Sequence, residues 1–161
     1  MSQNLSQRNT TKVSLSSVHE SWDAKLAIDG IRTQTDYKLC SHTALGSSKA
    51  WFQVDLKDYY SLKSVKIYYR SETLWPPYRF RQFYLDVSNS SANVSSTLHR
   101  TRCYQDETPE LEIPPALIDI PCRHTARYVI VETTYEASED EEGDGAVLEI
   151  CEIQVYGILF S

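Results

Sequence analysis

Four cysteines constrain this chain more than any other feature of its sequence. They stand at Cys40, Cys103, Cys122 and Cys151 in a polar chain of 161 residues. Disulfide bonds persist in oxidising compartments and are rare in the cytosol. We therefore expect an extracellular domain in which two bridges consume every thiol. Such a domain has no cysteine nucleophile, which favours recognition over thiol chemistry.

Four cysteines can form two disulfide bonds in three different ways. Cys103 and Cys122 bracket a proline-rich segment between two predicted strands. Pairing them would close a loop of about 20 residues and contribute roughly 3 kcal/mol in the chain-entropy model. Cys40 and Cys151 would then close a loop on the order of 100 residues, contributing roughly 4–5 kcal/mol in the same model. That second bridge would join an early loop to the last strand.

Sequons of the N-x-S/T type also indicate the secretory pathway, because only there are they glycosylated. They begin at Asn4, Asn9, Asn89 and Asn93. The residues after Met1 are polar and lack the apolar segment of a signal peptide. No apolar run reaches the length of a membrane span. We expect residues 1–161 to form a single domain excised from a longer extracellular protein, either secreted or the ectodomain of a membrane protein.

Charge and composition exclude several classes of protein. The net charge of −6 argues against non-specific binding to nucleic acid. A hydrophobic content of 41% is too high for a disordered segment. The sequence contains no serine-hydrolase elbow, no zinc-protease motif and no glycine-rich phosphate loop. We therefore do not expect an enzyme.

Alternating apolar residues indicate a chain made mostly of strands. Its eleven Tyr and single Met accompany many β-branched residues, a composition that favours β-structure. In Ser64–Tyr69 the alternation puts Val65, Ile67 and Tyr69 on one face. The predicted strands are Trp51–Leu56, Ser64–Tyr69, Phe83–Val87, Tyr128–Val131 and Ile150–Val155. Short strands with long loops between them predict an all-β fold, a β-sandwich or jelly roll.

Two further segments have distinct compositions. Residues 138–145 are strongly acidic but lack the spacing of an EF-hand calcium loop. We expect a solvated loop there, with a cation site or a contact to a basic partner as the alternative. Trp22–Ile28 is the one segment that predicts a helical turn.

Seven segments, in order, carry the motifs of one known family. They are Asn4–Lys12, Ala27–Gly30, Cys40–Thr43, Trp51–Leu56, Val65–Arg70, Phe83–Asn89 and Leu148–Gly157. With the four cysteines in register, they resemble the F-type lectin (fucolectin) domain over nearly the whole chain. The resemblance implies a jelly roll, an architecture shared with the discoidin-type domains of coagulation factors. It also implies the bridges Cys40–Cys151 and Cys103–Cys122.

The resemblance further implies a sugar site. Members of the family bind terminal L-fucose through one histidine and two arginines, and the matching residues are His42, Arg70 and Arg79. Guanidinium groups supply several fixed donors to hydroxyl and ring oxygens, and a histidine nitrogen adds a donor or an acceptor. The methyl group of a 6-deoxy sugar needs an aromatic or apolar wall, for which Trp75 and Tyr78 are candidates.

The sequence departs from the family between the two arginines. The family motif runs R-x-D and often continues into two adjacent cysteines. Here Ser71-Glu72 follows Arg70, and residues 73–78 replace the cysteine segment. Arg81 therefore competes for the role of second arginine. We prefer Arg79 because it lies four residues before Phe83, as in the family.

A structural calcium ion is a third implication of the resemblance. The matching ligands are carbonyls near Ile31, Leu39 and Cys151, the side chains of Gln34 and Asp36, and Glu152. Oxygen ligands suit a hard cation. Gln34 replaces an acidic residue of the family, and Asp29 or Glu149 could compensate for the lost charge.

The sequence thus predicts a lectin module whose partners are fucosylated glycans or glycoproteins. The alternative is an adhesion or receptor module that keeps the fold and binds a protein ligand. Its contact surfaces would be the Leu74–Tyr78 loop, with Trp75 as an anchor, and the acidic loop. The two functions differ in whether His42 and the two arginines form an open pocket or are capped.

Overall fold

Antiparallel strands carry almost all of the regular structure. The computed structural model describes residues 3–72, 78–94 and 97–160. Its strands are β1 (Gln3–Asn4), β2 (Lys12–Leu15), β3 (Ser41–His42), β4 (Ala50–Tyr69), β5 (Tyr84–Ser88), β6 (Thr101–Gln105), β7 (Leu117–Pro121), β8 (Thr125–Thr133) and β9 (Glu149–Leu159). Its short 3₁₀ helices are η1 (Leu5–Gln7), η2 (Ala24–Ala27), η3 (Tyr37–Leu39) and η4 (Thr97–His99). The predicted all-β class is confirmed, and η2 is the helical turn expected within Trp22–Ile28.

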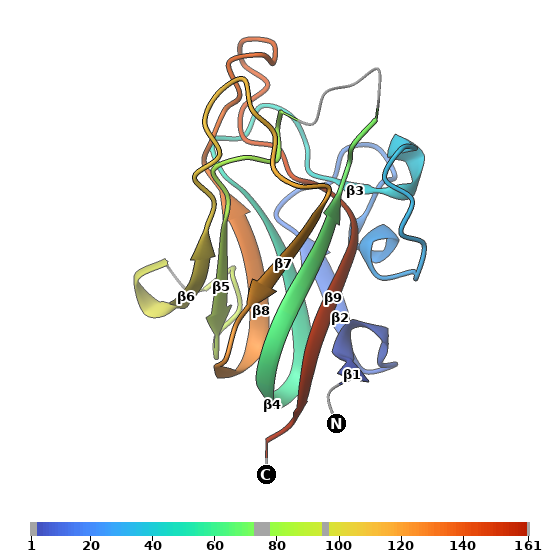
Figure 1. The fold of residues 1–161 in the computed structure, drawn as a ribbon, viewed down its shortest axis with the longest axis vertical. Coiled ribbons are helices and arrows are strands. Elements are labelled where there is room, and N and C mark those ends of the chain that lie inside the picture. The colour runs from blue at the N-terminus through green and yellow to red at the C-terminus, as the bar shows by residue number, and fades with distance from the viewer. Residues whose placement is uncertain (1–2, 73–77, 95–96, 161) are drawn as a thin grey trace.

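Strand β4 is the element that both layers of the sandwich share (Figure 1). Its first half pairs with β2 and β8, and its second half pairs with β7 and β9. The change of direction occurs around Lys57, whose φ of 66° lies in the left-handed region. The predicted strands Trp51–Leu56 and Ser64–Tyr69 are therefore the two halves of one element.

Apolar side chains from both layers meet in a common core. Val65, Ile67 and Tyr69 are 0%, 0% and 1% exposed, which confirms that they share the inward face of β4. Phe52 from the first half of β4 and Leu85 from β5 are equally buried. Burying such side chains is the main favourable contribution to folding, at roughly 25 cal/mol per Å² of apolar surface.

The two disulfide bonds tie loops to this sandwich. Cys40 bonds to Cys151 in β9, across 111 residues of sequence. Cys103 in β6 bonds to Cys122, which follows β7, across 19 residues. Both predicted pairings are confirmed. The first bridge holds the loop before β3 against β9, and the second holds the β7–β8 connection against β6.

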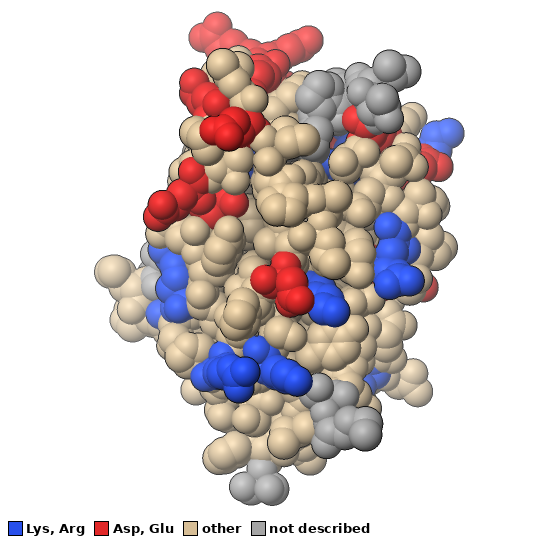
Figure 2. All heavy atoms as spheres, in the orientation of Figure 1, with Lys and Arg blue, Asp and Glu red and all other residues tan. Residues whose placement is uncertain are grey.

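Charge is distributed unevenly over the molecule. On the face shown in Figure 2, acidic side chains gather at the upper end and most of the basic ones lie lower. The segment 138–145 projects at the upper end, beyond β3 and the start of β9 (Figure 1). Among the described residues, no helix is long and apolar enough to cross a membrane.

Candidate functional site

Strand pairing brings the predicted site residues together at one end of the sandwich. In the β3–β9 ladder His42 lies directly opposite Glu149. Arg70 follows the last residue of β4, and its backbone N–H donates to the Glu149 carbonyl at 3.2 Å. Arg79 reaches the same place from the segment before β5. The three side chains that the family resemblance selects therefore converge, as that resemblance predicts for a shared site.

Glu149 lies at the centre of this cluster. Arg70 Nη1 donates to Glu149 Oε2 at 2.5 Å, and Arg79 Nη1 donates to Glu149 Oε1 at 3.1 Å. His42 Nε2 lies 3.5 Å from Glu149 Oε2. One carboxylate thus bridges both guanidinium groups and contacts the imidazole. We refer to His42, Arg70, Arg79 and Glu149 as the His/Arg cluster.

Sequence reasoning did not place Glu149 in the site. It considered Glu149 as a compensating calcium ligand or a solvent-facing strand residue, whereas the structure buries its side chain to 5% exposure. The available signal was its position between the apolar residues Leu148 and Ile150, in a strand that also carries buried Cys151. A carboxylate in such a strand needs cationic partners.

Further carboxylates hold the outer sides of the two arginines. Glu72 Oε2 accepts from Arg70 Nε and Nη2 at 3.1 and 2.8 Å. Asp140 accepts from Arg79 Nε and Nη2 at 2.6 and 3.0 Å, and Asp144 lies 3.5 Å from Arg79 Nη2. Two-point pairing of this kind fixes the plane of a guanidinium group.

The acidic segment is mostly exposed, as expected for a solvated loop, but two of its carboxylates pair with Arg79. The Asp140 side chain is only 3% exposed, because the segment folds back over Arg79. Burial alone would raise the pKa of Asp140, but its hydrogen bonds with Arg79 outweigh burial and lower that pKa below the usual range. The same pairs, with Glu149, outweigh the effect of burial on Arg79 and raise its pKa.

His42 is held as a neutral imidazole. Its Nδ1 lies 2.6 Å from the Thr43 carbonyl oxygen, which requires Nδ1 to carry the proton. Burial lowers the pKa of His42, and the neighbouring Glu149 opposes that effect only in part. Nε2 is then an acceptor, and it lies 3.4 Å from Arg79 Nη1. This tautomer can accept a hydrogen bond from a ligand hydroxyl.

Aromatic rings border the cluster on the side of η3. The His42 ring lies 4.6 Å from the His19 ring and 5.8 Å from the Trp22 ring, measured between centroids. Tyr37 contacts Trp22 edge to face at 5.1 Å, and the Arg70 guanidinium lies 5.2 Å from the centre of the Tyr37 ring. Trp22 is half-buried, and Tyr37 is exposed.

These rings were not predicted as the aromatic wall. The predicted residue Trp75 lies outside the described residues. The second candidate, Tyr78, is half-buried, and its pKa is raised by burial and then by the nearby Asp140. The wall near Trp22 comes from an early loop that the Cys40–Cys151 bridge and the β3–β9 pairing bring to the site.

Arg81, the competing candidate, belongs to a separate structural network. Its side chain is fully buried, and its Nε donates to the Tyr78 carbonyl at 2.7 Å. Its Nη1 donates to the Glu112 carbonyl at 3.1 Å, and its Nη2 pairs with Glu139 at 2.5 Å. These bonds tie three loops together, so Arg81 serves the fold and lies apart from the His/Arg cluster.

The His/Arg cluster offers both donors and acceptors within a small volume. Sugar hydroxyls donate and accept at once, so recognition of a polyol needs groups of both kinds. The guanidinium groups donate, whereas the neutral His42 and the carboxylates accept. The side chains of Arg70 and Arg79 are 12% and 10% exposed, so a ligand hydroxyl can reach only the exposed part of each guanidinium group.

The predicted calcium ligands are brought together only in part. Gln34 Nε2 donates to the Tyr69 and Ala116 carbonyls at 2.8 and 2.6 Å. Asp36 Oδ1 accepts from the Lys38 N–H at the start of η3. Within the described residues, no three His, Cys, Asp or Glu side chains are grouped closely enough to hold a metal ion by themselves.

Among the predicted calcium ligands, Glu152 has a buried carboxylate oxygen that lacks a hydrogen-bond partner among the described residues. It is fully buried, and its Oε2 accepts from the Gly30 N–H at 3.1 Å. Its Oε1 has no hydrogen-bond partner among the described residues. Burial, followed by the nearby Asp29 carboxylate, raises the pKa of Glu152 to about 8. A buried oxygen without a partner beside a second carboxylate fits a bound cation.

The sequons differ in exposure. Asn4 caps η1, and its Oδ1 accepts from Ser6 and from the Val155 N–H in β9. Asn9, Asn89 and Asn93 are exposed. Glycosylation at these positions stays a prediction.

Comparison with known proteins gives one family match. Residues 26–131, well over half of the chain, match the family described as "NedA-like, galactose-binding domain". No curated protein sequence matches the chain.

Solved structures share the fold along nearly the entire chain. A fucolectin from striped bass (Morone saxatilis) serum is 25% identical with a TM-score of 0.76, and it matches 99% of this chain. The match covers 48% of that lectin, so the chain spans about half of its length. A fucose-binding module of Streptococcus pneumoniae is 21% identical with a TM-score of 0.71, covering 96% of this chain and 94% of the module.

Two further similarities show how widely the fold is used. The lectin domain of lectinolysin, solved with Lewis b antigen, is 23% identical with a TM-score of 0.70 and 95% coverage of both chains. A chitosan-binding module from a Paenibacillus chitosanase/glucanase is 22% identical with a TM-score of 0.68, covering 96% of this chain and 99% of the module. The latter is a binding module taken from an enzyme.

Proposed function

The chain belongs to the family of NedA-like galactose-binding domains, and we propose that it is a lectin module recognising terminal L-fucose or a similar sugar. The observation that carries the proposal is the convergence of His42, Arg70 and Arg79 on Glu149 at one end of the sandwich. The likeness to the striped bass fucolectin supports the choice of sugar.

Each member of the His/Arg cluster has a separate role in this proposal. Arg70 and Arg79 donate to hydroxyl or ring oxygens of the sugar. His42 Nε2 accepts from one further hydroxyl. Glu149 orients both guanidinium groups, so that their planes are fixed before the ligand arrives. Trp22 and Tyr37 supply the aromatic surface for the methyl group of a 6-deoxy sugar.

A structural calcium ion is part of the proposal. Glu152 would supply a carboxylate oxygen, with Asp29 beside it, and loop carbonyls near Ile31, Leu39 and Cys151 would complete the oxygen ligands. Asp36 and Gln34 lie in the same loop. Because these residues border the segment that carries His42, the ion would order the site without taking part in chemistry.

Thermal unfolding with and without calcium tests this cation site. Calcium should raise the melting temperature of the wild type at pH 7.5, because it binds the folded state. Glu152→Gln keeps the shape of the side chain but removes its charge, and should abolish the shift. A shift that persists in Glu152→Gln, or no shift in the wild type, would refute the site.

The proposed partners are fucosylated glycans or glycoproteins outside the cell. Both disulfide bonds fit an oxidising compartment, and the structurally similar striped bass fucolectin comes from serum. We propose binding without catalysis, since the structurally similar modules are named for what they bind. A longer protein could still combine this module with others, as the chitosanase module does.

A glycan array tests the function. With calcium present, the wild type should bind fucosylated glycans. Arg79→Lys keeps the positive charge but loses the planar fork of donors, so binding should fall at least tenfold. Arg81→Lys is the matched control, because it makes the same change in the structural network, and its folded fraction should retain binding.

The alternative of a protein-binding module makes a different prediction for the same array. Its proposed contact residues 74–77 lie outside the described residues, and the acidic segment partly covers Arg79. A folded, disulfide-bonded sample that binds no glycan on the array would refute the sugar site. It would direct attention to the acidic segment as a surface for a basic partner.

A further inference from the structure

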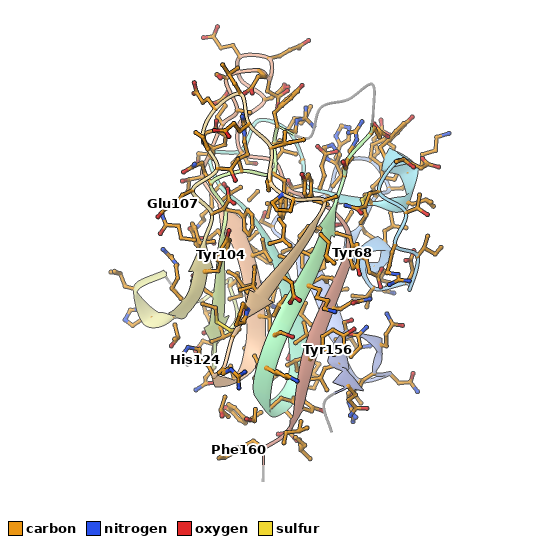
Figure 3. The ribbon with its side chains drawn as sticks, in the orientation of Figure 1. Tyr68, Tyr104, Glu107, His124, Tyr156 and Phe160 are labelled. Carbon is orange, nitrogen blue, oxygen red and sulfur yellow. A yellow bond between two sulfur atoms is a disulfide. The ribbon has the colours of Figure 1, made fainter. Side chains whose placement is uncertain are left out.

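A second cleft lies at the opposite end of the sandwich from the His/Arg cluster. It has a volume of about 420 Å³, within the range of small-ligand sites. Lys63, Arg123 and His124 contribute its basic side chains. Lys63 lies near the start of the second half of β4 and Arg70 directly follows its end, seven positions apart, or roughly 23 Å at about 3.3 Å per residue. Figure 3 labels His124 toward the end that carries Phe160. We call this cavity the basic cleft.

Backbone contacts hold the basic cleft in shape. The Leu62 N–H donates to the His124 carbonyl at 2.9 Å, and the Cys122 N–H donates to the Lys63 carbonyl at 3.0 Å. Cys122 is also bonded to Cys103. These contacts fix the backbone of the residues before and after Arg123. The starting point of the Arg123 side chain is therefore defined.

Close approach of two strands forms the floor of the cleft. A Cβ placed on Gly157 in β9 would lie 2.6 Å from the Ser61 carbonyl oxygen of β4. Only glycine therefore lets the strands approach this closely, and the β4–β9 register shifts beside it, between Leu62 and Ser64. Ile158 is 48% exposed at the edge and gives the cleft an apolar wall.

The charges of the basic cleft are uncompensated. Its lining contains no Asp or Glu. Among the described residues, Lys63, Arg123 and His124 take part in no ion pair. The arginines that do have carboxylate partners are Arg70, Arg79, Arg81, Arg100, Arg102 and Arg127.

This contrast makes an anion the best match to the cleft. A chain with net charge −6 offers many carboxylates, yet Lys63 and Arg123 share one cleft whose lining contains none. Isolated surface charges need no explanation, but two cations beside one concave floor attract the opposite sign. Lysine and arginine bind sulfate-like and carboxylate groups through charge-assisted hydrogen bonds.

A smaller polar cleft continues from the basic cleft. Its volume is about 200 Å³, and it shares His124 and Thr125 with its larger neighbour. Ser88, Ser90 and His99 also line it. Hydroxyl and imidazole groups of this kind suit the hydroxyls of a sugar. The two clefts together therefore offer places for an anionic group and for an adjoining polyol.

We propose that the basic cleft binds the sulfate or carboxylate group of an acidic oligosaccharide, with an adjoining sugar in the polar cleft. Lys63 and Arg123 pair with the anionic group, and His124 lies between the two clefts. Ile158 contacts the apolar side of the sugar ring that carries the anionic group. This site is independent of the His/Arg cluster, so one domain would bind two glycan classes at its two ends.

Calorimetric titration with a heparin-derived tetrasaccharide tests the proposal. Lys63→Ser combined with Arg123→Ser should weaken binding at least tenfold. Lys25→Ser combined with Lys49→Ser is the control, because it removes the same charge from exposed positions outside both clefts, and should change affinity less than twofold. In wild type, amide NMR shifts should centre on Thr125 and Gly157.

A second titration identifies the anionic group. The desulfated tetrasaccharide keeps only carboxylates: binding of both forms assigns the site to carboxylate, and binding of the sulfated form alone assigns it to sulfate. Absence of binding, equal loss in both double variants, or binding of inorganic sulfate but of neither oligosaccharide would overturn the proposal. Fucose binding, measured on the same variants, should be unchanged. It therefore reports separately on the His/Arg cluster.

Discussion

At the scale of single residues, the shared carboxylate Glu149 is the feature that most determines how this site can work. Two arginines with 10–12% exposed side chains are costly to bury unless their charges are matched. Glu149 matches both, and Glu72 and Asp140 are the outer partners of Arg70 and Arg79. The resulting network holds the donors in fixed planes, which is the preorganisation that a weakly interacting neutral sugar requires.

Glu149→Gln should therefore weaken both sugar binding and folding. The amide keeps the size of the side chain but loses the charge that both arginines share. We expect at least a tenfold loss of affinity for L-fucose, and a loss of about 1–3 kcal/mol in the free energy of unfolding because Glu72 and Asp140 remain. Calorimetry and urea denaturation measure the two effects.

Glu132→Gln is the matched control for this variant. Glu132 is fully buried in β8 and accepts from Arg100 Nη1 at 3.2 Å, outside the His/Arg cluster. It should destabilise the fold to a similar degree and leave fucose affinity unchanged. If Glu149→Gln binds fucose as well as wild type, Glu149 does not orient the arginines.

Acidification should destabilise the protein through His42. Its pKa lies below the ordinary value of 6.5 because burial disfavours the imidazolium; Glu149 opposes this, whereas Arg79 and His19 add to it. Below about pH 6.5 the unfolded chain then binds more protons at this position than the native state, so the free energy of unfolding falls with pH. Urea denaturation at pH 7.5, 6.5 and 5.5 should show a smaller fall for His42→Gln. Equal falls in both proteins would contradict the neutral assignment.

The sequence predicted which cationic residues lie together better than it predicted their carboxylate partners. His42, Arg70 and Arg79 were selectable because each stands in a recognisable local motif. Glu149 and Asp140 were not, because their partners are set by the β3–β9 register and by a loop that folds back. The apolar neighbours of Glu149 indicate that it is buried, but they do not identify its partners, because long-range pairing has no short-range signal in the sequence.

At the scale of elements, the structure depends on strand pairing held at two places by disulfide bonds. Alternation predicted the strands and the inward face of β4. It did not show that two predicted strands are one element, since exposed residues at Lys57–Tyr59 read as a separating loop. The structure shows that the two segments form one strand, β4, whose two halves pair with different neighbours.

Removing each of the two disulfide bonds should have a different effect on fucose binding. Cys103→Ser with Cys122→Ser opens a short loop and should cost up to about 3 kcal/mol in the chain-entropy model while sparing fucose binding. Cys40→Ser with Cys151→Ser should cost up to roughly 5 kcal/mol in that model. It should also impair fucose binding, because the bridge holds the loop before His42 against β9.

Urea denaturation and calorimetry with L-fucose on both variants separate these effects. The second titration is made at a temperature where each variant is still folded. Equal fucose affinities in the two folded variants would contradict a positioning role for the Cys40–Cys151 bridge.

At the scale of the whole molecule, the domain presents different chemistry at its two ends. Arg79 of the His/Arg cluster pairs with Asp140 of the acidic segment, and residues 61–63, which follow the turn of β4, line the basic cleft. The acidic segment and the turn of β4 lie at opposite ends of the sandwich (Figure 1). The basic cleft could not be predicted from the sequence, since Lys63 and Arg123 are distant in the chain and are brought to one cleft by the pairing of β4 with β7.

A single sugar site per domain should bind weakly and gain strength by repetition. We expect a dissociation constant on the order of micromolar to millimolar for one chain and free fucosylated trisaccharide. Four biotinylated copies on streptavidin should bind a fucosylated surface about 10²–10⁴-fold more tightly, because later contacts form at high effective concentration. Surface plasmon resonance compares the two forms. Equal apparent affinities would argue against multivalent use.

The crystal structure of the domain with a fucosylated trisaccharide tests the central claim most directly. We predict terminal L-fucose within hydrogen-bond distance of His42, Arg70 and Arg79, with its methyl group against Trp22 or Tyr37. Trisaccharide bound elsewhere, or a His/Arg cluster that keeps all its ion pairs and excludes sugar at saturating concentration, would contradict the account.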